Sequence, residues 1–281
     1  MVRVGRVVAA SMAAAALVGG VGVPSVSAAP APAPARVAAP VVAPGSEIGV
    51  VQERRADGRV LASTCTVAFV AERPDGRRVA LTAGHCGKRG QAVGAPVPGK
   101  PDALVRVGTF AQSSNPPART TPEGYVLPED LTAPDWGVID LRPTTKSAAE
   151  RGPVRPTRVG EARVGDRVCQ QGVTSGWRCG VVRVVSPTQI STDITSRPGD
   201  SGGPLIRLSD GAALGIVSGG TAAEAPRDVP RMTFYWSLRD ALAQGGGLRL
   251  VTAGTPAAQR VSSPEVREVI TVDGTVPVGV F

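Results

Sequence analysis

Two short motifs carry the residue types of nucleophilic catalysis. The first is Thr82-Ala83-Gly84-His85-Cys86, and the second, later in the chain, is Gly199-Asp200-Ser201-Gly202-Gly203-Pro204. A serine hydroxyl attacks efficiently only when a base removes its proton, and imidazole can do so near neutral pH. The sequence contains a single histidine, His85. If a histidine activates Ser201, that histidine is therefore His85.

The two motifs, in this order, resemble those of the chymotrypsin-type serine peptidases. Val168-Cys169, Gly176-Trp177-Arg178-Cys179-Gly180 and Ser218-Gly219-Gly220 resemble segments of the bacterial streptogrisin branch. The resemblance covers roughly residues 48–245. It implies hydrolysis of peptide bonds through an acyl-enzyme intermediate, with no metal and no cofactor.

The resemblance also implies a role for each residue of the catalytic centre. Ser201 is the expected nucleophile, and His85 is the expected general base and then general acid. The glycines around Ser201 allow a sharp backbone turn and a close approach of substrate. The backbone N–H groups of Gly199 and Ser201 suit an oxyanion hole.

An aspartate must hold the imidazole in one tautomer and stabilise its cation. The family carries this aspartate between the histidine and the serine, just ahead of a strand of the first barrel. Asp135, directly before Trp136-Gly137-Val138-Ile139, fits that pattern. Asp140 and Asp130 remain alternatives for the same role.

The carboxylate of Asp200, beside the serine, needs a partner. In activated members of the family it pairs with a freed N-terminal ammonium. In this sequence no Ile-Val-Gly-Gly-like start follows a basic residue, because the nearest arginine upstream of Ile48 is Arg36. The streptogrisin resemblance therefore implies an internal partner for Asp200, such as an arginine.

The sequence leaves two alternatives for the residue that selects the substrate side chain. Ser218-Gly219-Gly220 resembles the edge segment that pairs with the substrate backbone. If the segment before Ser201 has the bacterial branch's two-residue insertion, Asp193 lies near the position that selects basic side chains. Without that insertion Thr195 lies there, and the preference is for apolar or small side chains. Thr195 also stands where the family has a cysteine, so the family's third disulfide is missing.

The four cysteines allow three pairings. Their spacing in the sequence favours Cys65–Cys86 and Cys169–Cys179, one local disulfide in each half of the chain. A zinc site is the alternative, but the cysteines lack the two-residue spacing that zinc knuckles use.

The elements that must position these residues are short strands. Turn signals such as Pro74-Asp75-Gly76 and Asn115-Pro116-Pro117 separate apolar runs, and each half has about six strand candidates. This pattern predicts an all-β protein, and the resemblance specifies two six-stranded antiparallel β-barrels, over about 47–145 and 157–236. A short C-terminal helix is expected at Ser237–Ala243, before three glycines. The expected strands include 65–70, 79–82, 104–107, 136–139, 164–169, 179–185, 204–206, 213–217 and 233–236.

Outside the peptidase domain, expected over 47–247, three segments differ in composition. Residues 1–28 combine two arginines, an apolar stretch and Val26-Ser27-Ala28, the pattern of a cleavable signal peptide. Residues 29–46 are rich in Ala and Pro and are expected to be a linker or short propeptide. Residues 248–281 form a C-terminal extension to which the sequence assigns no role.

The charge composition limits the classes of partner that we expect. The net charge is +8, with 31 basic and 23 acidic residues, but the basic residues are scattered rather than clustered. We therefore expect no nucleic-acid binding and no stable membrane association. The expected protein is a secreted, extracellular monomer that acts on protein or peptide substrates.

A catalytically inactive binding module of the same fold is the alternative function. An α/β-hydrolase is disfavoured because its histidine would follow the serine.

Overall fold

The computed structural model describes residues 40–114, 133–221, 227–255 and 268–277. The predicted signal peptide at 1–28 and the alternative aspartate Asp130 lie outside these residues. The first half of the chain supplies β1 (Val41–Val42), β2 (Glu47–Arg54), β3 (Val60–Thr66), β4 (Val70–Glu72), β5 (Arg78–Thr82), the 3-10 helix η1 (Gly84–Cys86), β6 (Ala92–Val97), β7 (Lys100–Ser113), β8 (Gly137–Leu141) and β9 (Lys146–Ser147). The second half supplies β10 (Arg158–Val159), β11 (Arg167–Gly172), β12 (Gly176–Val185), β13 (Gln189–Thr192), β14 (Pro204–Arg207), β15 (Ala212–Gly220), β16 (Thr233–Ser237), α1 (Leu238–Gln244), β17 (Arg249–Leu250) and β18 (Val269–Pro277).

The first barrel is formed by β2, β3, β5, β6, β7 and β8. Its antiparallel neighbours are β3 and β2, β2 and β6, β6 and β7, β7 and β8, and β8 and β5. The ring closes just after β3, where the N–H of Ala68 donates to the carbonyl of Leu81 at 2.7 Å. Alternate residues of these strands face inward around Ile48, Val107 and Phe110.

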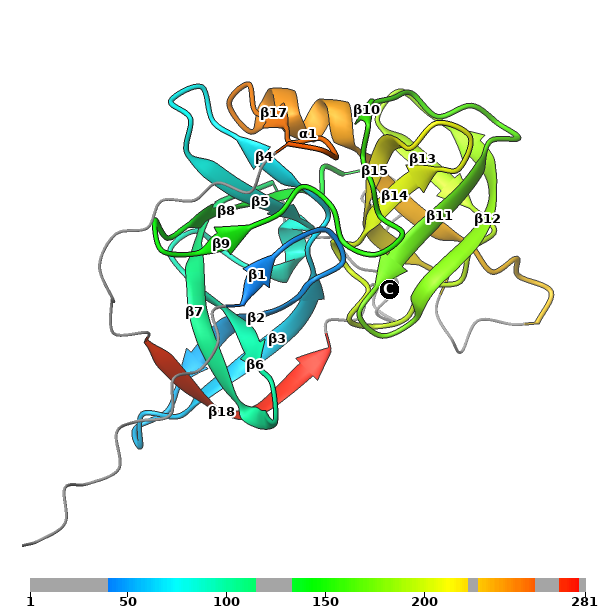
Figure 1. The fold of residues 1–281 in the computed structure, drawn as a ribbon. Helices are drawn as coiled ribbons and strands as arrows, with labels where there is room; N and C mark the ends of the chain where they lie inside the picture. Colours follow the sequence, from blue (N-terminus) through cyan, green and yellow to red (C-terminus); the bar gives the residue numbers. More distant parts are fainter. Residues whose placement is uncertain (1–39, 115–132, 222–226, 256–267, 278–281) are drawn as a thin grey trace, which may run out of the picture. The chain divides into compact units, whose positions relative to one another are not determined.

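The second barrel is a closed ring in the order β11, β12, β13, β16, β15 and β14, all antiparallel. Its core packs around Leu205, Leu214 and the fully buried Tyr235. Cys169 and Cys179 face each other across β11 and β12 and form a disulfide. The expectation of an all-β fold with two six-stranded barrels is confirmed, and the barrels are visible beside each other in Figure 1.

A shared apolar cluster joins the two barrels. It contains Phe69 and Trp136 from the first barrel and Ile216 and Trp236 from the second. Helix α1 packs onto the same cluster through its buried leucines, and the side-chain hydroxyl of Ser237 caps its first turn. Packing through this cluster holds the two barrels together and so contributes to the position of the His85 motif relative to the Ser201 motif.

Segments on both sides of the expected domain also pack against it. β1 pairs with β9, and Val42 and Ala43 are buried, so the packed body includes the end of the stretch we expected to be a linker. β17 pairs with β4, and β18 lies between β3 and β7. Among the described residues, none of the helices has the length and apolar character needed to span a bilayer.

Candidate active site

The histidine lies in η1, the short turn that follows β5. A disulfide joins Cys86, at the end of this turn, to Cys65 in β3, as predicted. The hydroxyl of Thr82 donates to the carbonyl of Thr66 at 2.8 Å and ties the end of β5 to β3. Because both sulfurs are bonded to each other, they are not available as thiolate ligands for a metal beside His85.

Asp135 holds the histidine through two separate contacts. One carboxylate oxygen accepts the backbone N–H of His85 at 2.8 Å, and the other bonds Nδ1 of the ring at 2.8 Å. The hydroxyl of Ser218 donates to that second oxygen at 2.6 Å. With Nδ1 donating to a carboxylate, the neutral ring has its lone pair on Nε2.

The electrostatics of this buried pair favour its charged form. Burial lowers the pKa of His85, but the charge of Asp135 and its hydrogen bond outweigh burial, so the pKa lies above the ordinary histidine value. Burial likewise raises the pKa of Asp135, while the charge and hydrogen bonds of His85 and Ser218 hold it below the usual range. An imidazolium formed during a reaction is therefore stabilised at this site.

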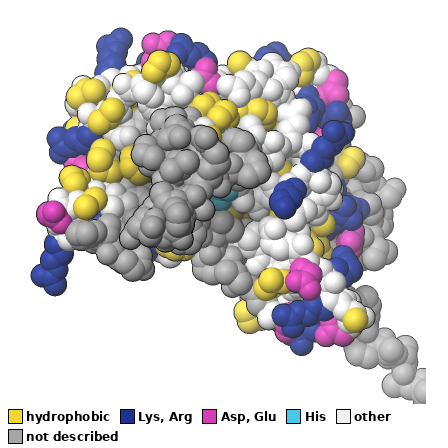
Figure 2. Space-filling model, turned by 180° about the vertical axis from the view of Figure 1, so that it is seen from behind, with side chains coloured by type: hydrophobic (Ala, Val, Ile, Leu, Met, Phe, Trp, Pro, Cys, Tyr) yellow, Lys and Arg dark blue, Asp and Glu magenta, His cyan; other side chains and the backbone are white. Residues whose placement is uncertain are grey.

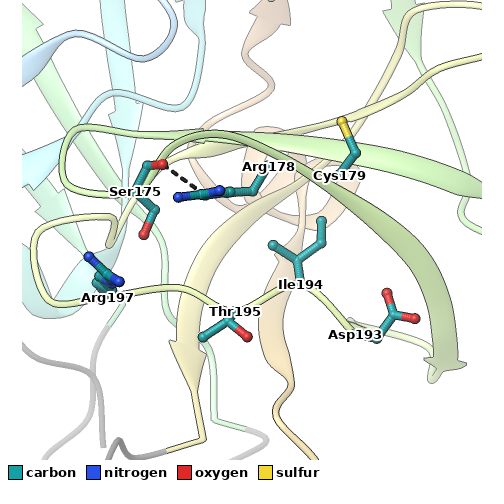
Figure 3. Close-up of a pocket in the computed structure, with 7 residues that line it drawn as sticks. All are labelled: Ser175, Arg178, Cys179, Asp193, Ile194, Thr195 and Arg197. Carbon is teal, nitrogen blue, oxygen red and sulfur yellow. Dashed lines mark hydrogen bonds between the residues drawn. The ribbon is translucent and has the colours of Figure 1, made fainter.

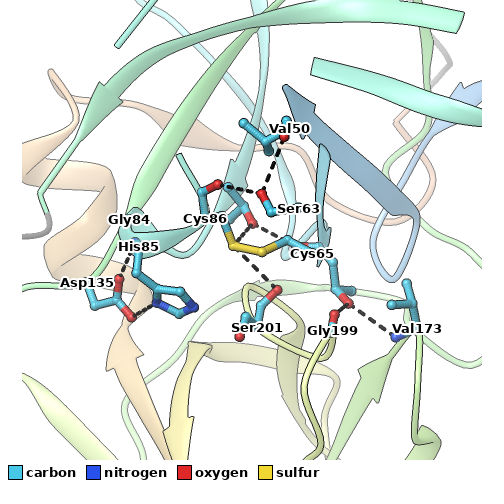
Figure 4. The surroundings of a disulfide bond; sticks show 12 residues. Val50, Ser63, Cys65, Gly84, His85, Cys86, Asp135, Val173, Gly199 and Ser201 are labelled. Atoms are coloured by element: carbon cyan, nitrogen blue, oxygen red, sulfur yellow. Dashed lines mark hydrogen bonds and ion pairs between the residues drawn. A yellow bond between two sulfur atoms is a disulfide. The ribbon is translucent and has the colours of Figure 1, made fainter. Parts of the chain in front are cut away.

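Ser201 comes from the turn before β14 in the second barrel and is almost fully buried. The His85 ring is directed toward it, and Nε2 has no hydrogen-bond partner among the described residues (Figure 4). A small part of the histidine side chain, in cyan, is visible at the surface in the view of Figure 2. The alternative Asp140 lies elsewhere, paired with Arg73 at 2.7 Å.

The glycines of the serine motif adopt backbone conformations that other residues rarely take. Gly199 has φ +97° and Gly202 has φ +85°. A Cβ atom on Gly202 would overlap the hydroxyl of Thr82. In the described part of the chain, the N–H of Gly199 has no acceptor, as a donor in an oxyanion hole requires.

Asp200 is completely buried, and within the described ranges its carboxylate accepts hydrogen bonds only from backbone N–H groups. One oxygen accepts the N–H groups of Thr174 and Ser175 at 3.0 and 2.9 Å, and the other accepts the N–H of Arg197 at 2.8 Å. The expected internal partners are therefore backbone amides rather than a guanidinium. A Cβ on Gly172 would overlap the Asp200 carboxylate, which explains the glycine there.

The residues expected to bind substrate lie on two different segments. Ser218, Gly219 and Gly220 form the end of β15, where it pairs with β16. Asp193 and Thr195 line a recess of about 260 Å³ that those three residues do not line (Figure 3). The Asp193 carboxylate accepts the N–H of Val181 at 2.7 Å and the Nε–H of Arg183 at 2.9 Å, and these bonds lower its pKa.

Thr66 is a residue that the sequence did not identify. Its N–H donates to the carbonyl of Ser201 at 2.8 Å, and its hydroxyl donates to the carbonyl of Gly199 at 2.8 Å. It thus connects the histidine's barrel to the serine's turn. Its position next to Cys65 was the one feature of the sequence that could have identified Thr66. The bond from Ser218 to Asp135 was also missed, since that serine was expected only to contact substrate.

The sequence pattern of the trypsin family matches residues 63–237. Streptogrisin-C of Streptomyces griseus is 30% identical over 203 residues, which are 68% of this chain but only 38% of that protein. Serine protease 2 of Streptomyces fradiae is 29% identical over 175 residues, 56% of this chain and 87% of that protein. The crystal structure of Thermobifida fusca Protease A has a TM-score of 0.54 and 25% identity, and the match covers 76% of this chain and 100% of that chain. Together with the two barrels and the arrangement of His85 and Ser201, these similarities establish that the chain belongs to the trypsin family.

Proposed function

We propose that this protein is a secreted serine endopeptidase that cleaves peptide bonds through an acyl-enzyme. The observation that carries the proposal is the position of His85. Its Nδ1 is bonded to Asp135, while its Nε2 is unpaired among the described residues and directed toward Ser201. The two disulfides support an oxidising compartment, consistent with export.

In the proposed reaction, the Ser201 hydroxyl attacks the carbonyl carbon while Nε2 of His85 takes its proton. Asp135 stabilises the resulting imidazolium. The N–H groups of Gly199 and Ser201 donate to the oxyanion of the tetrahedral intermediate. His85 then gives its proton to the leaving amine, and water attacks the ester in a second round of the same steps.

A fluorophosphonate probe tests this proposal. We expect the purified protein to form a covalent adduct on Ser201, located by mass spectrometry of the labelled peptide. Ser201→Ala should remove the label while thermal unfolding remains unchanged. Folded protein that stays unlabelled would favour the inactive binding module instead.

We further propose that the catalytic turn is formed without release of a new N-terminus. The Asp200 carboxylate is already satisfied by three backbone N–H groups. Ile48 is buried inside β2, where it pairs with Cys65 of β3 as part of a strand. No freed ammonium is then needed to shape the oxyanion hole.

The pocket is proposed to accept an apolar or small side chain before the cleaved bond. The Asp193 carboxylate already accepts hydrogen bonds from Arg183 and from the backbone of Val181. These bonds compensate its negative charge, which a basic substrate side chain would need as its partner. Digestion of a peptide library is expected to give cuts after apolar or small residues, unchanged in Asp193→Asn. Cuts after Arg or Lys that disappear in Asp193→Asn would contradict this preference.

A further inference from the structure

The glycine of the expected oxyanion hole lies in a tight turn over residues 197–200. The N–H of Asp200 donates to the carbonyl of Arg197 at 2.9 Å, which closes a four-residue turn with Pro198 and Gly199 at its centre. Gly199 has φ +97°, a left-handed value that the third residue of a type II turn requires. A type I turn can keep the same closing hydrogen bond. The two forms differ by a rotation of the central peptide through about 180°.

The orientation of this central peptide decides whether an oxyanion hole exists. The peptide that joins Pro198 to Gly199 is trans, so its carbonyl and its N–H point in opposite directions. In the observed turn the N–H of Gly199 has no acceptor among the described residues, as a donor to an oxyanion requires. In the type I form the carbonyl of Pro198 would point there instead and would repel the oxyanion. Gly199 itself does not prevent this rotation, because glycine adopts negative and positive φ with similar ease.

One side chain holds the central peptide in the observed orientation. The hydroxyl of Thr174, in the loop between β11 and β12, donates to the carbonyl of Pro198 at 2.7 Å. A Cβ atom on Gly199 would lie 2.4 Å from the same hydroxyl oxygen, so the threonine lies directly against the turn. Within the described ranges, the carbonyl of Pro198 accepts no other hydrogen bond. The bond from Thr174 is therefore the contact that distinguishes the two forms of the turn.

Other contacts fix the groups on both sides of the central peptide. The hydroxyl of Thr66 donates to the carbonyl of Gly199 at 2.8 Å. The carboxylate of Asp200 accepts the backbone N–H of Thr174 at 3.0 Å, which places the threonine beside the turn. Neither bond involves the C=O or the N–H of the peptide between Pro198 and Gly199. That peptide can therefore rotate alone once the bond from the Thr174 hydroxyl is lost.

We propose that Thr174 is a positioning residue that selects the type II turn and so directs the N–H of Gly199 toward the oxyanion of the tetrahedral intermediate. It acts only through the carbonyl of Pro198. The inference rests on the proposed peptidase function. An interaction that is needed only when the oxyanion forms contributes to kcat rather than to binding of the substrate, so its loss should lower kcat and leave KM almost unchanged.

The first test compares three variants with the original chain. Thr174→Val keeps the branched shape and removes the hydroxyl, whereas Thr174→Ser keeps the hydroxyl. Thr157→Val is the matched control, because the exposed Thr157 likewise donates to a backbone carbonyl at 2.7 Å, that of Asp210 between β14 and β15. We expect Thr174→Val to lower kcat for a peptide substrate by at least about tenfold, with KM changed by less than about twofold. Thr174→Ser and Thr157→Val should stay within about threefold of the original chain.

The outcomes of this test separate the inference from the proposed function. A Thr174→Val loss smaller than tenfold relative to Thr157→Val, or a loss that serine does not restore, would overturn the positioning role. A loss accompanied by an equal rise in KM and a lower melting temperature would also overturn it, in favour of a general structural role. Fluorophosphonate labelling of the original chain at Ser201 checks the function itself. Without that labelling the peptidase function fails, and this inference fails with it.

A transition-state analogue gives a readout that a structural role would not change. A peptide boronic acid forms a tetrahedral adduct with a catalytic serine, and one of its oxygens occupies the oxyanion position. In Thr174→Val its inhibition constant should rise by the factor by which kcat/KM falls, because both depend on the same N–H donor. The inhibition constant of the cleaved peptide product should remain unchanged. A boronic acid that binds Thr174→Val and Thr157→Val equally well would contradict the proposed effect on the N–H of Gly199.

Discussion

Replacing His85 with alanine is expected to lower kcat for a peptide substrate by about 10⁶-fold. The chain has no second histidine that could take the proton from Ser201. The fold should persist, because Asp135 keeps the hydroxyl of Ser218 and the backbone N–H of residue 85 as donors. Single-turnover kinetics with a peptide substrate give the measurement, and thermal unfolding is the check on folding.

The double variant His85→Ala, Ser201→Ala sharpens this test. When two residues act in the same step, removing either one removes the contribution of both. The double variant should therefore be no slower than either single variant. A His85→Ala protein that retains activity within tenfold of the original would contradict the role of general base. Losses that multiply in the double variant would show that the two residues act independently.

Asp135→Asn is expected to lower kcat/KM by about 10⁴-fold near neutral pH. The amide would stabilise the wrong tautomer of His85 and could not balance the charge of an imidazolium. Asp140→Asn is the matched control, because Asp140 pairs with Arg73 on the surface and should change kcat/KM only slightly. A larger loss for Asp140→Asn than for Asp135→Asn would reverse the assignment.

The pH dependence of kcat/KM gives a second readout of Asp135. The imidazole accepts a proton only when neutral, so activity should fall as the pH drops through the pKa of His85. That pKa is raised by the charge and hydrogen bond of Asp135, so half-maximal activity should lie above the ordinary histidine value. Asp135→Asn removes the charge that raises the pKa of His85, so the acid limb of the pH profile should move to lower pH.

Short motifs allowed the fold and the candidate site to be predicted, because these motifs carry the resemblance to the chymotrypsin-type peptidases. His85 and Ser201 lie in short motifs, and the spacing of the cysteines favoured the pairs that the structure contains. Asp135 precedes a strand, which distinguished it from other aspartates. The role of each as a catalytic residue remains a proposal that the variants above test.

What the sequence did not predict depends on contacts between distant segments. The partners of Asp200 are backbone N–H groups, which carry no side-chain signature. The contacts of Thr66 exist only once the two barrels pack together. Val and Ile recur between polar residues over 266–272, but no local pattern indicates that a strand from this segment pairs with β3 and β7.

The late position of β18 in the chain has a consequence for how the protein folds. Asp273 and Arg55, which pair across this strand, are 218 positions apart in the sequence. Contacts of such separation form slowly, because the loop must close before the contact stabilises it. Until β18 arrives, β3 and β7 offer open edges that can pair with other chains. These edges of the first barrel are thus covered only after the second barrel has been synthesised, and a chain interrupted before residue 269 is a candidate for aggregation.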